Sequence, residues 1–281
     1  MAPVRQLSGT EFSASLLEYK RALRHDWHAH DQPVLTLVLA GHVEEVVSGG
    51  TRLVAPLDIG FKPAGIRHAD RFGDHGVRAL RIVLEPPLLA AVEQAAGRTF
   101  DWWWRSRSPA VTALMRIAIR LCGSESAESD PRDDLQDALA ALATEHRGDE
   151  HRSPSTWLRH VREEIDDRHG VGVRLTELAL NAGVHPVYLA RRFRIHYGCS
   201  VGEYIRWRRA VAAIELLRDG HEPIVYVAAR VGCSDQPHLT RVLRATSGAT
   251  PALLRRLVTT PTTEVQNVQD ATGAPLIASR E

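Results

Sequence analysis

An internal repeat in the C-terminal half constrains the fold of this chain more than any other feature. At an offset of fifty residues, Leu189, Arg191, Arg194, Gly198 and Ser200 match Leu239, Arg241, Arg244, Gly248 and Thr250. At an offset of forty-nine, Leu178, Ala179 and Gly183 match Val227, Ala228 and Gly232. Repeats with a fixed period of this size indicate one supersecondary unit that is used twice.

The repeated unit has the pattern of a helix-turn-helix. Ala179 and Ala228 stand where two helices would cross, and Gly183 and Gly232 stand where a tight turn favours a residue without Cβ. One such pattern is weak evidence, because any two-helix hairpin imitates it, but two in register are strong. Residues 201–218 between them predict one continuous helix of about 27 Å, comparable to the ~34 Å that separates successive major-groove faces of B-DNA.

Charge is distributed unevenly along the chain. Residues 151–258 contain 17 Arg, no Lys and 10 Asp plus Glu, a net charge of +7, whereas the whole chain carries only +1. A basic module on an acidic body is typical of a protein that binds nucleic acid with one end.

Residues 155–257 resemble the DNA-binding domain of the AraC/XylS family of bacterial transcription regulators. The matching motifs are L-x-R-x-L-R-x-x-x-G-x-T-P at 239–251 and V-A-x-x-V-G at 227–232. Leu243 and Cys233 depart from the aromatic residues that the family often has there, but both are apolar and keep the packing. The resemblance implies a tandem helix-turn-helix that binds promoter DNA, commonly as a homodimer.

The exposed N-terminal part of each recognition helix is expected to read base edges. Arginine suits guanine, glutamine suits adenine, and small apolar groups suit the thymine methyl group. Arg194 and Arg244, nearer the helix ends, are better placed for phosphates. The predicted DNA-binding residues are Val187, Ala190, Arg191, Arg194, Gln236, Thr240, Arg241 and Arg244.

The N-terminal part has short β segments punctuated by Gly and Pro, and it resembles a cupin, a small β-barrel that many AraC/XylS proteins use as a sensor. His28-x-His30 matches the H-x-H of the first cupin motif, and P-x-G-x-x-H at 63–68 matches the second. Residues i and i+2 of a strand face the same way, so His28 and His30 would both point into the barrel. His68 would complete three imidazoles, a common ligand set for Zn²⁺, Fe²⁺ or Mn²⁺.

The carboxylate of metal-binding cupins is missing at its usual place, which Val34 and Leu35 occupy, and Gln32 is a poor substitute. His25 is an odd number of residues from His28, which predicts a surface or edge histidine. Three roles for His28, His30 and His68 therefore stay open. They are the ligands of a divalent metal, the lining of a small-molecule effector pocket, or hydrogen-bonding groups of the barrel.

The predicted fold class is α+β multidomain. Residues 1–86 form a cupin-like sensor domain, 87–150 a helical linker with a possible dimer surface, 151–258 the tandem helix-turn-helix domain and 259–281 a disordered tail. No apolar run reaches the length of a membrane span, the N-terminus has no apolar signal core, and the three cysteines form no pair. These features predict a cytoplasmic protein.

The sequence thus predicts a transcription regulator whose cupin-like domain senses a small-molecule effector, with no catalytic residues and no certain cofactor beyond a possible divalent metal. One alternative is a metal-dependent cupin enzyme with a helical appendix, which would show turnover without DNA binding. Another is a constitutive DNA-binding regulator whose cupin is purely structural, which would bind DNA independently of any ligand.

Overall fold

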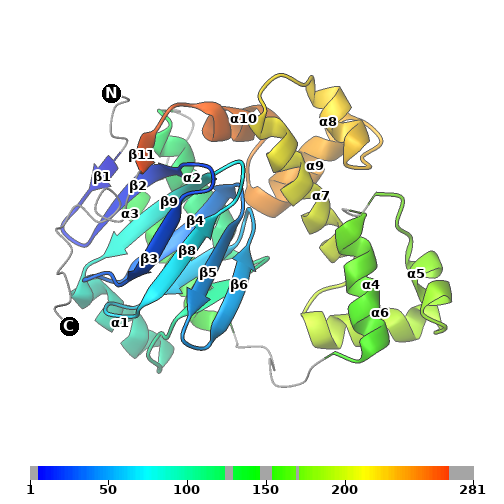
Figure 1. Cartoon of the computed structure of the whole chain (residues 1–281), viewed down its shortest axis with the longest axis horizontal. Coiled ribbons are helices and arrows are strands. Elements are labelled where there is room, and N and C mark those ends of the chain that lie inside the picture. Colours follow the sequence, from blue (N-terminus) through cyan, green and yellow to red (C-terminus); the bar gives the residue numbers. More distant parts are fainter. Residues whose placement is uncertain (1–5, 124–128, 146–153, 169–170, 266–281) are drawn as a thin grey trace. The chain divides into compact units, whose positions relative to one another are not determined.

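The computed structural model describes residues 6–123, 129–145, 154–168 and 171–265. The chain divides into two compact units. The β-rich unit comprises residues 1–144 and 252–281, and the helical unit comprises residues 145–251. The elements of both units are labelled in Figure 1.

Two antiparallel sheets form the body of the β-rich unit. The larger sheet has the strand order β1-β2-β9-β4-β7-β10, with β11 also paired to β2, and the smaller has the order β3-β8-β5-β6. The larger contains β1 (Gln6–Ser8), β2 (Phe12–Tyr19), β4 (Val34–Ala40), β7 (Ile59–Lys62), β9 (Val77–Leu84), β10 (Trp103–Arg105) and β11 (Thr263–Val265). The smaller contains β3 (Arg24–His28), β5 (Val43–Val47), β6 (Gly50–Val54) and β8 (His68–Phe72).

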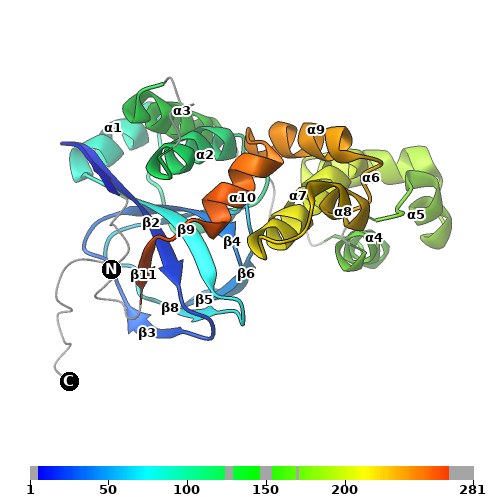
Figure 2. The same ribbon diagram turned by 90° about the horizontal axis from the view of Figure 1, so that it is seen from above.

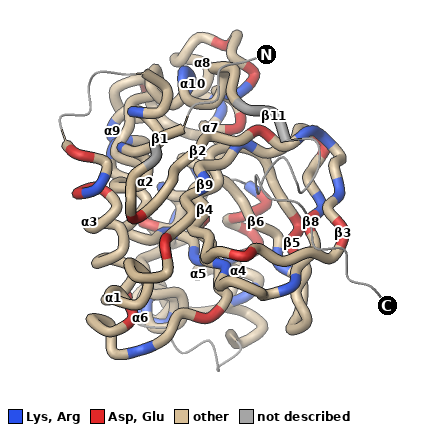
Figure 3. Tube along the Cα trace, turned by 90° about the vertical axis from the view of Figure 1, so that its left-hand side faces the viewer, with Lys and Arg blue, Asp and Glu red and all other residues tan. Residues whose placement is uncertain are grey.

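The inner faces of the two sheets share one apolar core. Val38, Ala79 and Trp104 from the larger sheet pack with Val43 and Phe72 from the smaller. Figure 3 shows acidic and basic residues interspersed along the trace of the smaller sheet.

Within the predicted linker, 87–150, the described residues up to Thr144 belong to the β-rich unit rather than to a separate linker, and residues 124–128 and 146–150 lie outside the described part of the chain. Helices α1 (Pro86–Ala96), α2 (Ala110–Leu121) and α3 (Pro131–Thr144) belong to the β-rich unit, where they lie together beside the larger sheet (Figure 2). Helix α2 is apolar on most of its circumference and is buried between β2 and α3. The segment after α1 adds strand β10 to the sheet edge beside β7. The helical expectation for this region is therefore right, but its separation from the β domain is wrong.

The chain from residue 252 onward also belongs to the β-rich unit. Helix α10 (Pro251–Thr259) leads to β11, which pairs in parallel with β2. The predicted disordered tail, 259–281, is therefore corrected for its first residues, because Thr263–Val265 form a strand. Residues 266–281 lie outside the described part of the chain.

The helical unit contains the predicted repeat. It consists of α4 (Thr156–Asp167), α5 (Leu175–Asn181), α6 (Pro186–Tyr197), α7 (Val201–Arg218), α8 (Ile224–Arg230) and α9 (Gln236–Ser247). The pairs α5–α6 and α8–α9 are the two helix-turn-helix motifs, and α7 connects them over the residues that the sequence predicts.

Local chemistry explains why the two motifs match. Gly183 and Gly232 have φ angles of 65° and 74°, a left-handed conformation that a turn can adopt cheaply only with glycine. Gly198 and Gly248 end α6 and α9 in the same conformation. The side chain of Asp235 caps α9 by accepting a hydrogen bond from His238 N at 2.6 Å.

Among the residues that the structure describes, no helix is both long enough and apolar enough to cross a membrane.

Candidate functional site

The three histidines that the sequence selects come together in the β-rich unit. His28 pairs with His68 across strands β3 and β8, and their ring centroids are 4.2 Å apart. His30 lies just beyond β3, with its ring centroid 5.0 Å from that of His68. All three side chains are buried, and their candidate ligand atoms lie within 4.8 Å of one another.

Hydrogen bonds from the rings to backbone carbonyls determine the tautomers of two of these histidines. His28 Nδ1 lies 2.8 Å from Asp26 O, and His68 Nδ1 lies 3.2 Å from Ile66 O. A carbonyl oxygen can only accept, so each Nδ1 carries the hydrogen and each neutral ring has its lone pair on Nε2. Among the described residues, His68 Nε2 is buried and has no hydrogen-bond partner.

Burial keeps these rings neutral. Desolvation lowers the pKa of His28 and of His68 below the usual value for histidine, with the positive charge of Lys62 acting in the same direction. Desolvation also lowers the pKa of His30 to about 2. Neutral imidazoles with inward-facing lone pairs are in the form that ligates a metal.

A carboxylate completes the cluster from a position that the sequence did not suggest. Asp70 Oδ2 lies 3.9 Å from His28 Nε2 and 3.9 Å from His68 Nε2. Asp70 follows His68 by two residues on β8, so both side chains lie on the same face of the strand. The expectation of a missing carboxylate at Val34 and Leu35 is therefore corrected, since another strand supplies one. The H-x-D spacing at 68–70 was the available signal.

His25 also faces the cluster, so its prediction as a surface or edge histidine is wrong. The side chain is buried, and its Nδ1 lies 3.8 Å from Asp70 Oδ2. The register of β3 against β8 shifts between His25 and His28. Such an irregularity breaks the two-residue alternation, so residues three apart reach the same face. Gln32, by contrast, donates its amide hydrogen to Glu85 Oε1 at 3.1 Å.

A buried network of charges adjoins the histidines. Lys62 Nζ lies 2.6 Å from Glu45 Oε2 and 3.9 Å from Asp70 Oδ1. The indole nitrogens of Trp102 and Trp104 donate to Glu45 Oε1 at 2.5 and 2.9 Å. No sequence motif predicts this network, because its members come from four separate segments of the chain.

Opposing effects set the protonation of this network. Burial alone would lower the pKa of Lys62, but the negative charges of Asp70 and Glu45 outweigh it and raise that pKa. Burial raises the pKa of Asp70 to about 6, against the opposing effect of Lys62. At neutral pH the Asp70 carboxylate therefore remains mostly ionised beside two histidine lone pairs.

A small cavity lies between the two sheets. It has a volume of about 40 Å³, lies beside the network and is lined by residues of both sheets that include Tyr19, Lys62 and Asp70. A water molecule needs roughly 10–15 Å³ of such volume, whereas pockets for drug-sized ligands have about 300–1,000 Å³. The cavity suits a few waters, an ion or a ligand of very few atoms.

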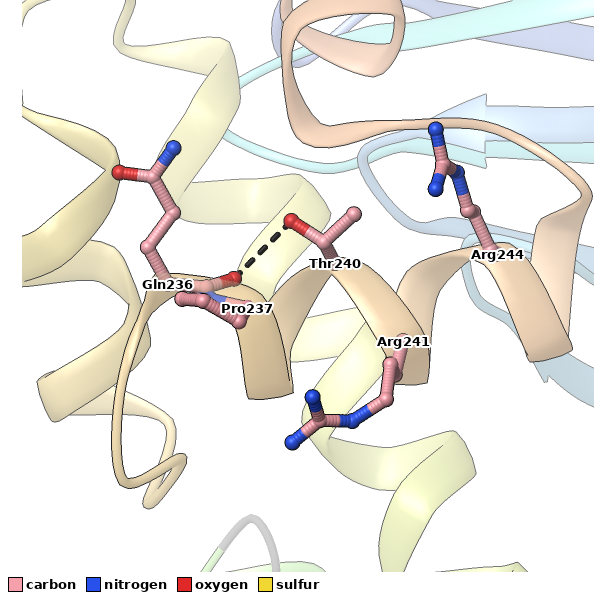
Figure 4. Close-up of a pocket in the computed structure, with 5 residues that line it drawn as sticks. All are labelled: Gln236, Pro237, Thr240, Arg241 and Arg244. Carbon is pink, nitrogen blue, oxygen red and sulfur yellow. Dashed lines mark hydrogen bonds between the residues drawn. The ribbon is translucent and has the colours of Figure 1, made fainter.

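The second recognition helix presents all four of its predicted DNA-binding residues on its surface. Gln236, Thr240, Arg241 and Arg244, with Pro237, line a shallow depression of about 430 Å³ on α9 (Figure 4). Gln236, Thr240 and Arg244 lie along one side of α9 at four-residue spacing, while Arg241 points to a different side. Thr240 Oγ1 donates to Gln236 O at 2.9 Å, which fixes its hydroxyl group.

The first recognition helix is more apolar. On α6, Val187 is 70% exposed and Arg191 is exposed, whereas Ala190 is half-buried. Arg194 Nη2 lies 3.8 Å from Glu203 Oε2, so part of its charge is compensated. Tyr188, 48% exposed, lies next to Val187 and was not selected from the sequence.

The C-terminal part of the chain is similar to known helix-turn-helix proteins. A family model described as a helix-turn-helix domain matches residues 178–257. The probable transcription factor PqrA of Proteus vulgaris is 33% identical over 92 residues, which cover 33% of this chain and 75% of that protein. The multiple antibiotic resistance protein MarA of Escherichia coli is 32% identical over 80 residues, which cover 28% of this chain and 63%, less than two thirds, of that protein. A structural match, ToxT from Vibrio cholerae O395, has a TM-score of 0.40 and 10% identity, and covers 90% of this chain and 100% of that one.

The tandem motifs and these relatives define a class, the helix-turn-helix transcription regulators. Within that class, the chain belongs to the AraC family.

Proposed function

We propose that this regulator senses a small effector or a metal ion at the histidine cluster of its β-rich unit and changes its binding to promoter DNA in response. One observation supports the proposal that the histidine cluster binds the sensed ligand. Asp70 Oδ2 lies 3.9 Å from His28 Nε2 and 3.9 Å from His68 Nε2, and none of these three atoms can donate a hydrogen to another. Buried acceptors that face one another are stabilised by a water molecule or a cation among them, and this set of nitrogen and oxygen atoms matches the ligands of a divalent metal.

The residues present fit a divalent metal, and we propose Zn²⁺, Fe²⁺ or Mn²⁺. His28, His30 and His68 would supply imidazole nitrogens, and Asp70 would supply the carboxylate that the cupin-like sequence pattern lacks. The carbonyls of Asp26 and Ile66 hold two of the rings in the ligating tautomer. A bound cation would supply positive charge and a coordination position that an effector could occupy.

An organic effector is the second candidate, and the cavity volume limits it. At about 40 Å³, the space between the sheets admits only a ligand of a few atoms unless the sheets separate. A metal or a small polar molecule therefore fits better than a drug-sized compound.

We propose that α6 and α9 enter successive major grooves of double-stranded promoter DNA. Arg191 and Arg241 occupy equivalent positions of the two motifs, and both are exposed, which supports base contacts for both. Arg244 is also exposed and suits a phosphate. Action as a homodimer in the cytoplasm remains a prediction from the family resemblance.

The metal content of the purified chain, after loading and exhaustive dialysis, tests the sensing proposal. We expect near-stoichiometric metal in the parent protein and its loss in His28→Ala and His68→Ala. His75→Ala, a change at an exposed histidine of the same unit, is the control and should keep the metal. Absence of metal from the loaded parent would contradict the metal proposal. The search would then turn to small molecules that alter DNA binding.

A further inference from the structure

The end of the chain joins the DNA-binding unit to the sheet of the β-rich unit. We call residues 252–265, most of α10 together with β11, the C-terminal strap. The family match extends to residue 257, yet the strap is part of the β-rich unit. Only three residues, Gly248–Thr250, separate the end of recognition helix α9 from the start of α10.

A buried arginine anchors the strap to β9. The side chain of Arg78 is 5% exposed and forms an ion pair with Glu18 of β2. Its Nη1 donates to Leu257 O at 2.9 Å and to Thr260 O at 2.6 Å. The last carbonyls of a helix lack partners within the helix and carry partial negative charge, so a guanidinium group there both satisfies and stabilises them.

Further contacts fix the rest of the strap. Thr262 Oγ1 donates to Leu16 O at 2.6 Å in a buried position. Strand β11 then pairs in parallel with the end of β2, with Val265 opposite Tyr19. At the other end, Arg256 Nη2 donates to Cys122 O and Gly123 O, just after α2. The strap is thus held by side-chain, helix-end and sheet contacts.

The two strands that hold the strap also line the cavity beside the histidine cluster. Val77 and Ala79 of β9 line that cavity, and Arg78 lies between them in the sequence. Because successive side chains of a strand point to opposite faces, Arg78 reaches the strap from the other side of the same strand. The cavity and the strap are therefore one strand apart.

Tyr19 makes the second connection. Its side chain lines the cavity, stacks on Phe72 with a centroid distance of 4.3 Å and meets His25 edge-on at 5.9 Å. Its backbone pairs with Val265 of the strap. Any shift of Tyr19 that follows a change at the histidines therefore acts directly on β11.

We propose that the C-terminal strap couples the histidine site to recognition helix α9. The nature of the sensed signal rests on the proposed function, but the mechanical coupling does not. A change in the site moves β2 and β9, the shift alters the anchoring of α10 by Arg78 and β11, and the three-residue link passes it to α9. Coupling free energies are reciprocal, so DNA binding must in turn affect β2 and β9.

Hydrogen exchange tests this reciprocity in the full chain without knowledge of the effector. The probe is a DNA duplex that the protein itself selects from a random-sequence library. On DNA binding, we expect exchange at the amides of Leu16–Tyr19 and Val77–Ala79 to change by about fivefold or more, the lower end of typical allosteric coupling. Unchanged exchange at both strands in the DNA-bound chain would overturn the proposal.

Two variants assign the coupling to the strap. Arg78→Met removes the anchor but keeps a long apolar side chain, and a chain that ends at Thr262 lacks β11. Both should still bind the duplex while the exchange response of β2 and β9 is lost. Arg71→Met, at an exposed arginine of the same unit, and a chain that ends at Asn267 are the controls and should keep the response. Retention of the full response in Arg78→Met and in the chain ending at Thr262 would also overturn the proposal.

The outcomes separate this inference from the proposed function. If the loaded chain holds no metal but exchange on β2 and β9 responds to DNA, the strap proposal stands and the metal proposal fails. If metal binds and alters DNA affinity but the strands do not respond to DNA, the sensing proposal stands and the strap proposal fails.

Discussion

Asp70 Oδ2 lies 3.9 Å from His68 Nε2, although the hydrogen-bonding pattern leaves the histidine nitrogen as an acceptor. Asp70 Oδ2, His28 Nε2 and His68 Nε2 are all acceptors, while Lys62 Nζ balances part of the carboxylate charge from the side of Asp70 Oδ1, 3.9 Å away. A cation among the three acceptors would attract all of them. This relationship makes Asp70 the residue on which the metal proposal depends most.

Asp70→Asn should therefore weaken metal binding with little change in shape. The substitution removes the charge but keeps the side-chain volume, and losses of about 10–100-fold are usual for groups that support a metal site. A competition titration with a chromophoric zinc chelator measures the change. Asp74→Asn, at an exposed position of the same unit, should leave the affinity unaltered. Equal affinities for the two variants would remove Asp70 from the site.

The metal-free protein should lose stability as the pH falls below about 6.5. Burial lowers the pKa of His30 to about 2 and also lowers those of His28 and His68. At a pH between the pKa of such a histidine in the folded state and its higher pKa in the unfolded chain, the unfolded chain binds a proton that the folded chain does not. The free energy of unfolding then falls by up to about 1.4 kcal/mol per pH unit for each such histidine.

Asp70 opposes this trend. Burial raises the pKa of Asp70 in the folded state to about 6. Between that pH and the lower pKa of Asp70 in the unfolded chain, the folded state binds a proton that the unfolded chain does not. Proton uptake by Asp70 therefore partly offsets the loss of stability that the histidines cause. Chemical denaturation with a chelator present, between pH 7.5 and 5, measures the net slope. His30→Gln should flatten it, and a parent protein whose stability does not change with pH would contradict the buried neutral cluster.

Gly60→Ala should destabilise the β-rich unit. A Cβ at this position would come within 2.6 Å of the Trp104 ring, which also donates a hydrogen bond to Glu45. Overpacking of this kind costs about 1–3 kcal/mol, and denaturant titration measures it. Gly49→Ala, where no atom lies within 4 Å of the new Cβ, is the control. Equal stability of the two variants would show that Trp104 moves freely.

Arg241→Ala should weaken DNA binding and relax the preference at one base position. Loss of an arginine that contacts a guanine costs about 1–3 kcal/mol of discrimination. Selection from a random library, followed by titration of the selected duplex, reports both effects. Arg230→Ala, on α8 where Arg230 pairs with Glu222 at 2.8 Å, should have a much smaller effect. An unchanged preference would assign Arg241 to the phosphates or to no contact.

Local patterns predicted the helical unit well. The repeat, the turn glycines and the small residues at the helix crossings all act over short stretches of sequence, and the structure has α7 over the residues expected. The β-rich unit was harder, because its site is assembled by strand pairing. Glu45, Lys62 and Asp70 come from β5, β7 and β8, and no spacing along the chain reveals that they meet.

Irregular backbone explains the other differences between the prediction from the sequence and the structure. A register shift in β3 turned His25 inward, against the simple alternation of a strand. Strand β11 forms only because β2 offers a free edge beyond β1, and a three-residue strand has no recognisable pattern of its own. Such edge pairing depends on the completed sheet.

The affinity of the full chain for its selected duplex, measured with and without bound metal, shows whether the histidine site controls DNA binding. We expect the two affinities to differ by about fivefold or more, as in typical coupled sites. The His68→Ala variant should bind DNA with one affinity whether or not metal is present. Equal affinities of the metal-loaded and metal-free parent protein, with stoichiometric metal bound in the loaded sample, would show that the site does not control DNA binding.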